Sequence, residues 1–156
     1  MNSRPEVSHF NLRVYGLFIN EQQEVLVADE FRFNRLMTKF PGGGLELGEG
    51  LLEGLLRECK EELGKEPIIL NHFYTTDFFQ PTQLLDQPSQ LISVYYQIRF
   101  PDPEKIPLLQ KPFDIEQTEG AIGFRWVSLL ESPETVTFPI DRHVWTLLQK
   151  LLEKSV

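Results

Sequence analysis

The sequence predicts a single domain, residues 1–156, of mixed α and β structure with a β-sheet packed between helices. A length of 156 residues is typical of one domain and is enough to bury a hydrophobic core. Apolar residues at helical spacing mark one segment near the middle of the chain and one at its end. Segments rich in aromatic and β-branched residues lie on both sides of the first helical segment. Because such helices and strands bury their apolar faces against one another, we expect a layered α/β arrangement.

The expected strands are short segments of alternating or continuous apolar character. They comprise residues 9–20, 24–28, 67–79, 91–100 and 122–129. A polar turn of three residues separates the first two strands, which predicts a hairpin. Residues 80–90 and 101–120 contain several prolines and are expected to be loops at the surface.

Residues 43–65, GGLELGEGLLEGLLRECKEELGK, run from a glycine loop into the first helix. The apolar residues of this helix recur at steps of three and four and predict a buried stripe. They are Leu51, Leu52, Leu55, Leu56, Cys59 and Leu63. Gly64 is expected to end the helix in the left-handed conformation. The last helix should begin near Pro139, with a buried stripe formed by Val144, Leu147, Leu148 and Leu151.

Three glutamates share the other face of the first helix. Glu58, Glu61 and Glu62 are three and four residues apart, so their carboxylates lie one turn from each other. Like charges at this spacing repel, and a cation between them would remove the repulsion. Hard divalent cations such as Mg²⁺ prefer carboxylate oxygens. The pattern therefore predicts a metal site on the helix, facing the glycine loop.

This stretch resembles the signature of the Nudix (MutT-like) hydrolase family, G-x5-E-x7-R-E-U-x-E-E-x-G-U, where U is an aliphatic residue. Every fixed position is filled, by Gly43, Glu49, Arg57, Glu58, Glu61, Glu62 and Gly64. Cys59 and Lys65 depart from two aliphatic positions, which affects packing and not the charged residues. The resemblance implies a Nudix-type α/β/α sandwich. It also implies metal-dependent hydrolysis of a phosphoanhydride bond in a nucleoside diphosphate linked to another group, X.

The resemblance also implies roles for individual residues. Glu58, Glu61 and Glu62 are expected to hold Mg²⁺, or Mn²⁺ as a substitute, together with the main-chain carbonyl of Gly42. Glu58 is further expected to act as the general base or to orient it. Arg57 is expected to hold a neighbouring glutamate in place, and Glu49 to support the site from the loop.

Residues outside the signature complete the expected site. Relatives often add an acid from a loop that precedes a tryptophan-bearing strand, and Glu119 fits this position better than Glu116. Residues 31–39 carry Arg32, Arg35 and Lys39 with no acid between them. This basic segment is either a phosphate-binding surface next to the metal loop or a solvated connection.

Composition limits the partners. The formal net charge of −8 argues against a nucleic acid polymer as the main partner, because binding one requires clustered Lys and Arg. A small nucleotide that carries its own divalent cations remains compatible with this charge. The N-terminus has no apolar signal sequence and the chain has no apolar run of membrane length. We therefore expect a cytoplasmic protein, monomeric or homodimeric, that does not bind membranes.

Two cues about the substrate point in different directions. Pro81 lies sixteen positions after Lys65, where relatives that act on ADP-ribose often have proline. The short region before the first strand instead resembles nucleoside triphosphate pyrophosphatases. A catalytically silent Nudix fold, used as a nucleotide sensor or a protein-binding module, is the alternative from a different class. Its mark would be missing acids in the signature, and here every acid is present.

Overall fold

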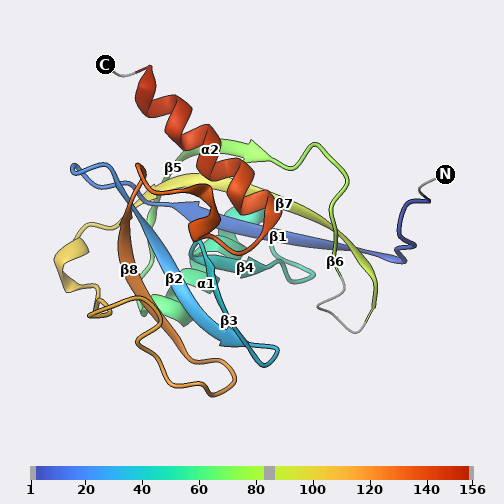
Figure 1. Cartoon of the computed structure of the whole chain (residues 1–156), viewed down its shortest axis with the longest axis horizontal. Helices are drawn as coiled ribbons and strands as arrows, with labels where there is room; N and C mark the ends of the chain where they lie inside the picture. Colours follow the sequence, from blue (N-terminus) through green and yellow to red (C-terminus); the bar gives the residue numbers. More distant parts are fainter. Residues whose placement is uncertain (1–2, 83–86, 155–156) are drawn as a thin grey trace.

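The computed structural model describes residues 3–82 and 87–154, and within these ranges the chain forms a layered α/β structure (Figure 1). The strands are β1 (His9–Leu17), β2 (Glu24–Arg32), β3 (Arg35–Lys39), β4 (Gly42–Gly44), β5 (Ile68–Thr75), β6 (Pro81–Thr82), β7 (Ser89–Arg99) and β8 (Ile122–Ser128). The α-helices are α1 (Leu51–Leu63) and α2 (Pro139–Glu153), and Pro103–Lys105 and Pro133–Thr135 are single turns of 3-10 helix.

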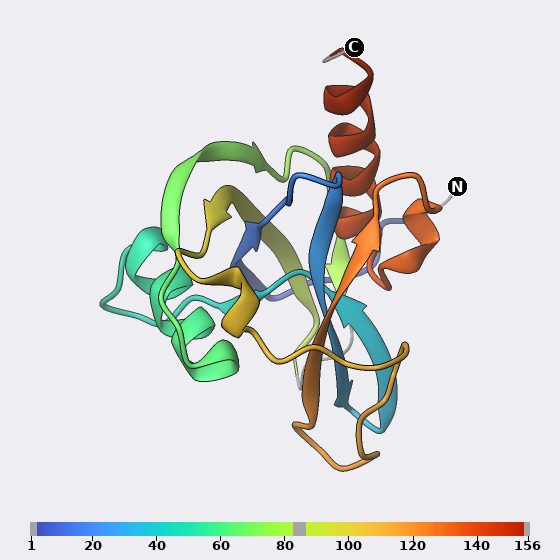
Figure 2. The ribbon, with the colours of Figure 1, turned by 90° about the vertical axis from the view of Figure 1, so that its left-hand side faces the viewer.

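The strands in the described ranges form two sheets rather than the single sheet that we expected. The first has the order β4-β1-β7-β5, with β6 paired to the first two residues of β7. In this sheet β1 and β7 run parallel, whereas the other neighbours are antiparallel. The second sheet, β3-β2-β8, is entirely antiparallel. Figure 2 shows α1 and α2 on opposite sides of the strands, and the predicted mixed α/β/α class is confirmed.

Strand alternation explains why the helices lie on opposite sides. Along β1, and likewise along β2, successive buried side chains point to opposite faces and belong to different hydrophobic cores, as a side-chain period of two requires. Val14 packs in the core under Leu55 of α1, whereas Tyr15 packs in the core under Trp145 of α2. Two cores on two faces therefore need two covering helices.

The two helices largely follow their predicted patterns. Gly64 ends α1 with a φ of 72°, the expected left-handed conformation, and its N–H bonds to the carbonyl of Lys60. Cys59 is fully buried, and burial raises the pKa of its thiol to about 12. The prediction that Leu52 and Leu151 are buried is wrong. They are 47% and 39% exposed, because they lie at the edges of the apolar faces of their helices.

The predicted hairpin between the first two strands is present only next to its turn. Ile19 and Val25 form an antiparallel bridge, and the backbone N–H groups of Asn20 and Leu26 donate to the carbonyls of Glu24 and Phe18, but β1 and β2 then continue into different sheets. A longer hairpin follows, where β2 pairs with β3 around Phe33 and Asn34. Both of these residues have positive φ, 53° and 58°, which is the backbone that a tight two-residue hairpin turn requires. The basic segment, residues 31–39, therefore consists of the end of β2, the turn and the whole of β3.

The proline-containing segments are mostly irregular, as expected. Residues 101–120 contain only the 3-10 turn and an isolated bridge at Leu108. The loop predicted over 80–90 instead contains β6 and the start of β7, while its residues 83–86 lie outside the described part of the chain. Among the described residues, no helix has the length and apolar character needed to span a bilayer.

Candidate active site

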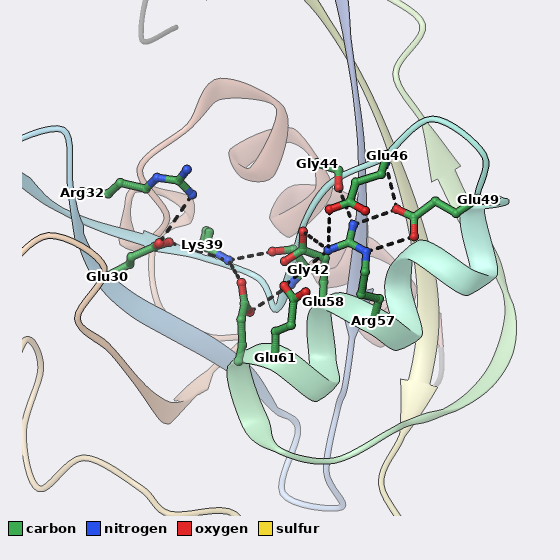
Figure 3. A network of polar contacts seen from close by, with 11 residues as sticks. Glu30, Arg32, Lys39, Gly42, Gly44, Glu46, Glu49, Arg57, Glu58 and Glu61 are labelled. Atoms are coloured by element: carbon green, nitrogen blue, oxygen red, sulfur yellow. Dashed lines mark hydrogen bonds and ion pairs between the residues drawn. The ribbon is translucent and has the colours of Figure 1, made fainter.

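Arg57 is the centre of the polar network on α1. Its guanidinium grips the carboxylate of Glu49 with two bonds, from Nη2 to Oε1 at 2.7 Å and from Nε to Oε2 at 2.9 Å. Nη2 also donates to the carbonyl of Gly44 at 2.9 Å. Figure 3 shows this arginine between Glu49 and the glutamates of α1. The bonds from Arg57 lower the pKa of Glu49 to about 2, so the pair stays charged and ties the glycine loop to the helix.

Glu58 and Glu61 lie on the other side of the same guanidinium. Nη1 of Arg57 is 3.1 Å from Oε1 of Glu58 and 3.3 Å from Oε2 of Glu61. The carboxylate of Glu58 rests against Gly43, where an added Cβ would lie 2.6 Å from the carboxyl carbon. A glycine at this position therefore leaves the space that the carboxylate of Glu58 fills.

Glu62, the third glutamate, pairs with Lys39. Nζ of Lys39 is 2.9 Å from Oε1 of Glu62, 2.9 Å from the carbonyl oxygen of Gly42 and 3.8 Å from Oε2 of Glu30. The lysine is 5% exposed. Burial alone would lower the pKa of Lys39, but the two carboxylates outweigh it and raise that pKa, so the ammonium remains charged.

A cavity with room for about 100 Å³ of solvent begins beside Lys39 and extends under the start of α2. Its walls combine aromatic rings with a few polar groups, as is typical of pockets for small ligands. The lining residues include Asn11, Arg13, Tyr15, Phe33, Phe138 and Asp141. Lys39 also lines the cavity and contacts Glu62, so the cavity lies next to this glutamate of α1.

Asp141 places a carboxylate deep in this cavity. It is 2% exposed, and the hydroxyl of Tyr95 donates to its Oδ1. Among the described residues, Oδ2 of Asp141 is the buried side-chain oxygen that has no hydrogen-bond partner. Burial raises the pKa of this carboxyl to about 6. A ligand that offers an N–H group would satisfy the open acceptor.

Arg13 is the cation that the sequence analysis missed. Its Nε donates to the hydroxyl of Tyr15, and its guanidinium lies over the ring of that tyrosine with 5.6 Å to the centroid. Nη1 lies 3.6 Å from the position of a Cβ added to Gly44, so the arginine reaches the glycine loop. The pattern of residues 9–20 predicted a strand and did not indicate that Arg13 contacts Tyr15 beside the glycine loop. Because residues two apart on a strand share a face, the spacing of Arg13 and Tyr15 could have predicted this contact.

The other predicted residues are dispersed. Arg32 lines the cavity, but half of its side chain is exposed and Nη1 is 3.9 Å from Glu30. Arg35 is exposed, with its guanidinium 5.9 Å from the ring centroid of Phe138. Glu119 accepts a bond from the backbone N–H of Phe33 at the hairpin turn.

The position of Glu119 does not bring it to the glutamates of α1. Phe33 lies beyond Arg35, and Arg35 and Lys39 are four positions apart on β3, a distance of about 13 Å along a strand. Glu116, the other candidate from this loop, is exposed. The role of either acid as a metal ligand stays a prediction.

The donor chemistry of the signature fits a hard divalent cation. Glu58, Glu61, Glu62 and the carbonyl of Gly42 all offer oxygen atoms, the ligands that Mg²⁺ and Mn²⁺ take. The space that Gly43 leaves for the carboxylate of Glu58 is part of this fit. Arg57 and Lys39 now neutralise these acids, and no three Asp, Glu, His or Cys side chains in residues 3–82 and 87–154 are grouped as a metal site.

Comparison with known proteins identifies the family. The sequence matches the NUDIX domain family over residues 9–147. No curated protein matches it. Among solved structures, the chain is similar to the MutT protein from Methanosarcina mazei Go1, with 21% identity and a TM-score of 0.63 over 91% of this chain and 94% of that one.

Two further solved structures share the fold. The E. coli ORF135 protein has 16% identity and a TM-score of 0.59, over 92% of this chain and 91% of that one. MutT, in a structure described for Aliivibrio salmonicida and Vibrio cholerae, has 22% identity and a TM-score of 0.55, over 88% and 95% of the two chains. Because the family match spans most of the sequence and includes every charged residue of the signature, the chain belongs to the Nudix hydrolase family.

Proposed function

We propose that the protein hydrolyses a phosphoanhydride bond in a nucleoside diphosphate linked to X and releases a nucleoside monophosphate. The observation that carries this proposal is that Lys39 contacts Glu62 of α1 and also lines a cavity whose walls suit a nucleoside. Lys39 and Arg13 line that cavity, and both also reach the glycine loop or α1. The phosphates of a bound nucleotide would therefore extend from the cavity towards Glu58 and Glu62.

The cavity itself supports a nucleobase as the bound group. A base is flat and apolar on its faces, which suits the rings of Phe33, Tyr15 and Phe138. It is polar at its edge, which suits Asn11 and the open acceptor of Asp141. A base edge with N–H donors is the complement of that carboxylate.

Glu58, Glu61 and Glu62 of α1 would hold Mg²⁺, with Mn²⁺ as a substitute, together with the main-chain carbonyl of Gly42 in β4. When bound, the cation supplies positive charge against the phosphate oxygens and makes a water more acidic. Glu58 is then the carboxylate that accepts or directs the proton of the attacking water. Arg57 positions Glu58 and holds Glu49, in the loop, against α1.

A screen with nucleoside triphosphates, oxidised nucleotides, ADP-ribose, nucleotide sugars and dinucleoside polyphosphates tests this proposal, each with Mg²⁺ and with Mn²⁺. Chromatography of the products identifies both the bond that is cleaved and X. Glu58→Gln should lower kcat on the best substrate by several orders of magnitude without unfolding the protein, because it removes charge and keeps volume. Glu66→Gln, a change at an exposed glutamate just after α1, is the matched control.

Near-normal turnover by folded Glu58→Gln would contradict the assignment of the metal site. Silence of the wild-type protein across the whole panel, with metal shown to bind, would favour the catalytically silent sensor.

A further inference from the structure

Lys39 occupies a cage of oxygen atoms that includes two of the expected metal ligands, Glu62 and the carbonyl of Gly42. The cage has three walls, the carboxylate of Glu30 on β2, the carboxylate of Glu62 on α1 and the main-chain carbonyl of Gly42 on β4. Figure 3 shows the ammonium group directed between Glu30 and Gly42. The side chains are 6% exposed for Lys39, 9% for Glu30 and 14% for Glu62, so the cage is largely closed to water.

Such a cage is suited to a small hard cation. Two carboxylates and one carbonyl are the oxygen donors that divalent cations take, and two nearby carboxylates cannot both stay ionised in a closed site without positive charge. An ammonium group has three N–H donors and no acceptor, and it meets the same three oxygens. Two of these oxygens, on Glu62 and Gly42, are also expected metal ligands.

We infer that Lys39 is a built-in cation that permanently takes the place of one divalent ion in this site. Lys39 neutralises Glu30 and part of Glu62, and the divalent ions that the enzyme binds are left to Glu58, Glu61 and the other oxygen of Glu62. The inference rests on the proposed function, because it refines the metal site of that function. It makes Lys39 a positioning residue for the metal site rather than the phosphate ligand expected from the sequence.

Counting bound metal tests the inference without any substrate. Free Mn²⁺ gives an electron paramagnetic resonance signal that bound Mn²⁺ does not, so titration of the protein gives the number of ions bound. Lys39→Met keeps the volume of the side chain and removes its charge, which empties the cage of positive charge. We expect this variant to bind one more equivalent of Mn²⁺ than the wild-type protein does. Lys60→Met, at an exposed lysine of α1, changes the net charge equally and should leave the number unchanged.

Thermal unfolding gives a second readout. With EDTA present, Lys39→Met should lower Tm by on the order of 10 °C, because Glu62 loses its ion pair with the lysine and Glu30 keeps only the half-exposed Arg32. Added Mn²⁺ should restore most of the loss, whereas it should barely shift the Tm of Lys60→Met. The double variant Glu30→Gln with Lys39→Met removes one wall charge together with the lysine. It should regain stability in EDTA and lose the additional Mn²⁺, which keeps the test decisive if the single variant folds poorly.

Two outcomes would overturn the inference. An equal number of ions in the wild-type protein and Lys39→Met, even with tighter binding in the variant, would mean that the metal displaces the lysine. No Mn²⁺ bound by either protein would mean that the cage takes no cation. A wild-type protein that binds no metal while Lys39→Met binds one would instead count against the proposed metal-dependent reaction and in favour of the cage.

Discussion

Arg57 and Glu49 form a two-bond ion pair, 2.7 Å and 2.9 Å long, that joins α1 to the loop in front of it. The same guanidinium also reaches the carbonyl of Gly44 and the carboxylate of Glu58. One planar group therefore sets the distance between the glycine loop and the glutamates, although neither Arg57 nor Glu49 needs to touch a substrate.

Arg57→Lys should lower kcat by roughly 10- to 100-fold, the usual effect of losing a group that orients metal ligands. Lysine keeps the charge but cannot make the two parallel bonds to Glu49 while also reaching Glu58. Steady-state kinetics on the best substrate checks this, with circular dichroism as the test of folding. Activity within twofold of the wild-type protein would show that the fork of bonds does not position Glu58.

Gly43→Ala should reduce activity far more than it reduces stability. The new Cβ would lie 2.6 Å from the carboxyl carbon of Glu58, and this flexible side chain can move away without disturbing the core. Glu58 would then be displaced from its position against the loop. Gly44→Ala is the matched control, because its Cβ would meet only Nη1 of Arg13, at an ordinary 3.6 Å. Equal losses of kcat in the two variants would contradict this account.

Asp141→Asn should stabilise the protein at neutral pH and not at acid pH. Burial raises the pKa of Asp141 to about 6 in the folded state, from an unfolded value near 3.8. A raised pKa means that the contribution of the group to stability is complete below the unfolded pKa and is lost as the pH rises through about 6. This shift of about two units corresponds to about 3 kcal/mol of lost stability when the carboxyl is ionised.

Differential scanning calorimetry at pH 8 and pH 4 checks the prediction for Asp141. At pH 8 the variant should unfold roughly 5–10 °C above the wild-type protein, and at pH 4 the difference should disappear. Asp102→Asn, at an exposed aspartate, should show no pH-dependent difference of this size. The same increase in Tm at both pH values would mean that charge at Asp141 is not the cause.

Arg13→Gln should raise KM by about 10-fold or more while changing kcat less, since a charge-assisted hydrogen bond contributes about 1.5–3 kcal/mol. The guanidinium lines the cavity and has its Nη groups on the side of the glycine loop, where we expect the substrate phosphates. Arg99→Gln removes the same charge from an exposed position at the end of β7 and should leave KM unchanged. If Arg13→Gln also leaves KM unchanged, then Arg13 serves only to pack on Tyr15.

Local sequence patterns predicted the first helix, its end at Gly64 and its two faces well. A helix fixes the relation between residues three and four apart, so Glu58, Glu61 and Glu62 had to share a face wherever the helix lay. The family and the fold class followed from the same stretch and are confirmed. The assignment of these acids as metal ligands stays a prediction.

Pairing between distant segments was beyond the sequence. We expected the strand at residues 9–20 to pair with the next strand in the sequence, but β1 pairs along its length with β7, about eighty residues later. The site depends on such long-range pairings, because β1 supplies Arg13 and β2 supplies Glu30. In the sequence, Asp141 is an ordinary acid in the first turn of a helix. Only the packing of α2 against the sheet buries it beside Tyr95.

The sequence by itself therefore determined the family, the helix that carries its signature and the acids on that helix, since these depend on residues close together in the chain. The tertiary structure alone decided which residues surround that helix. It directed Lys39 inward to Glu62 and left Arg32 and Arg35 at the surface, although all three are cations of one short segment. The physical reason is that the environment of a charge depends on contacts across strands and sheets, which no local pattern of residues encodes.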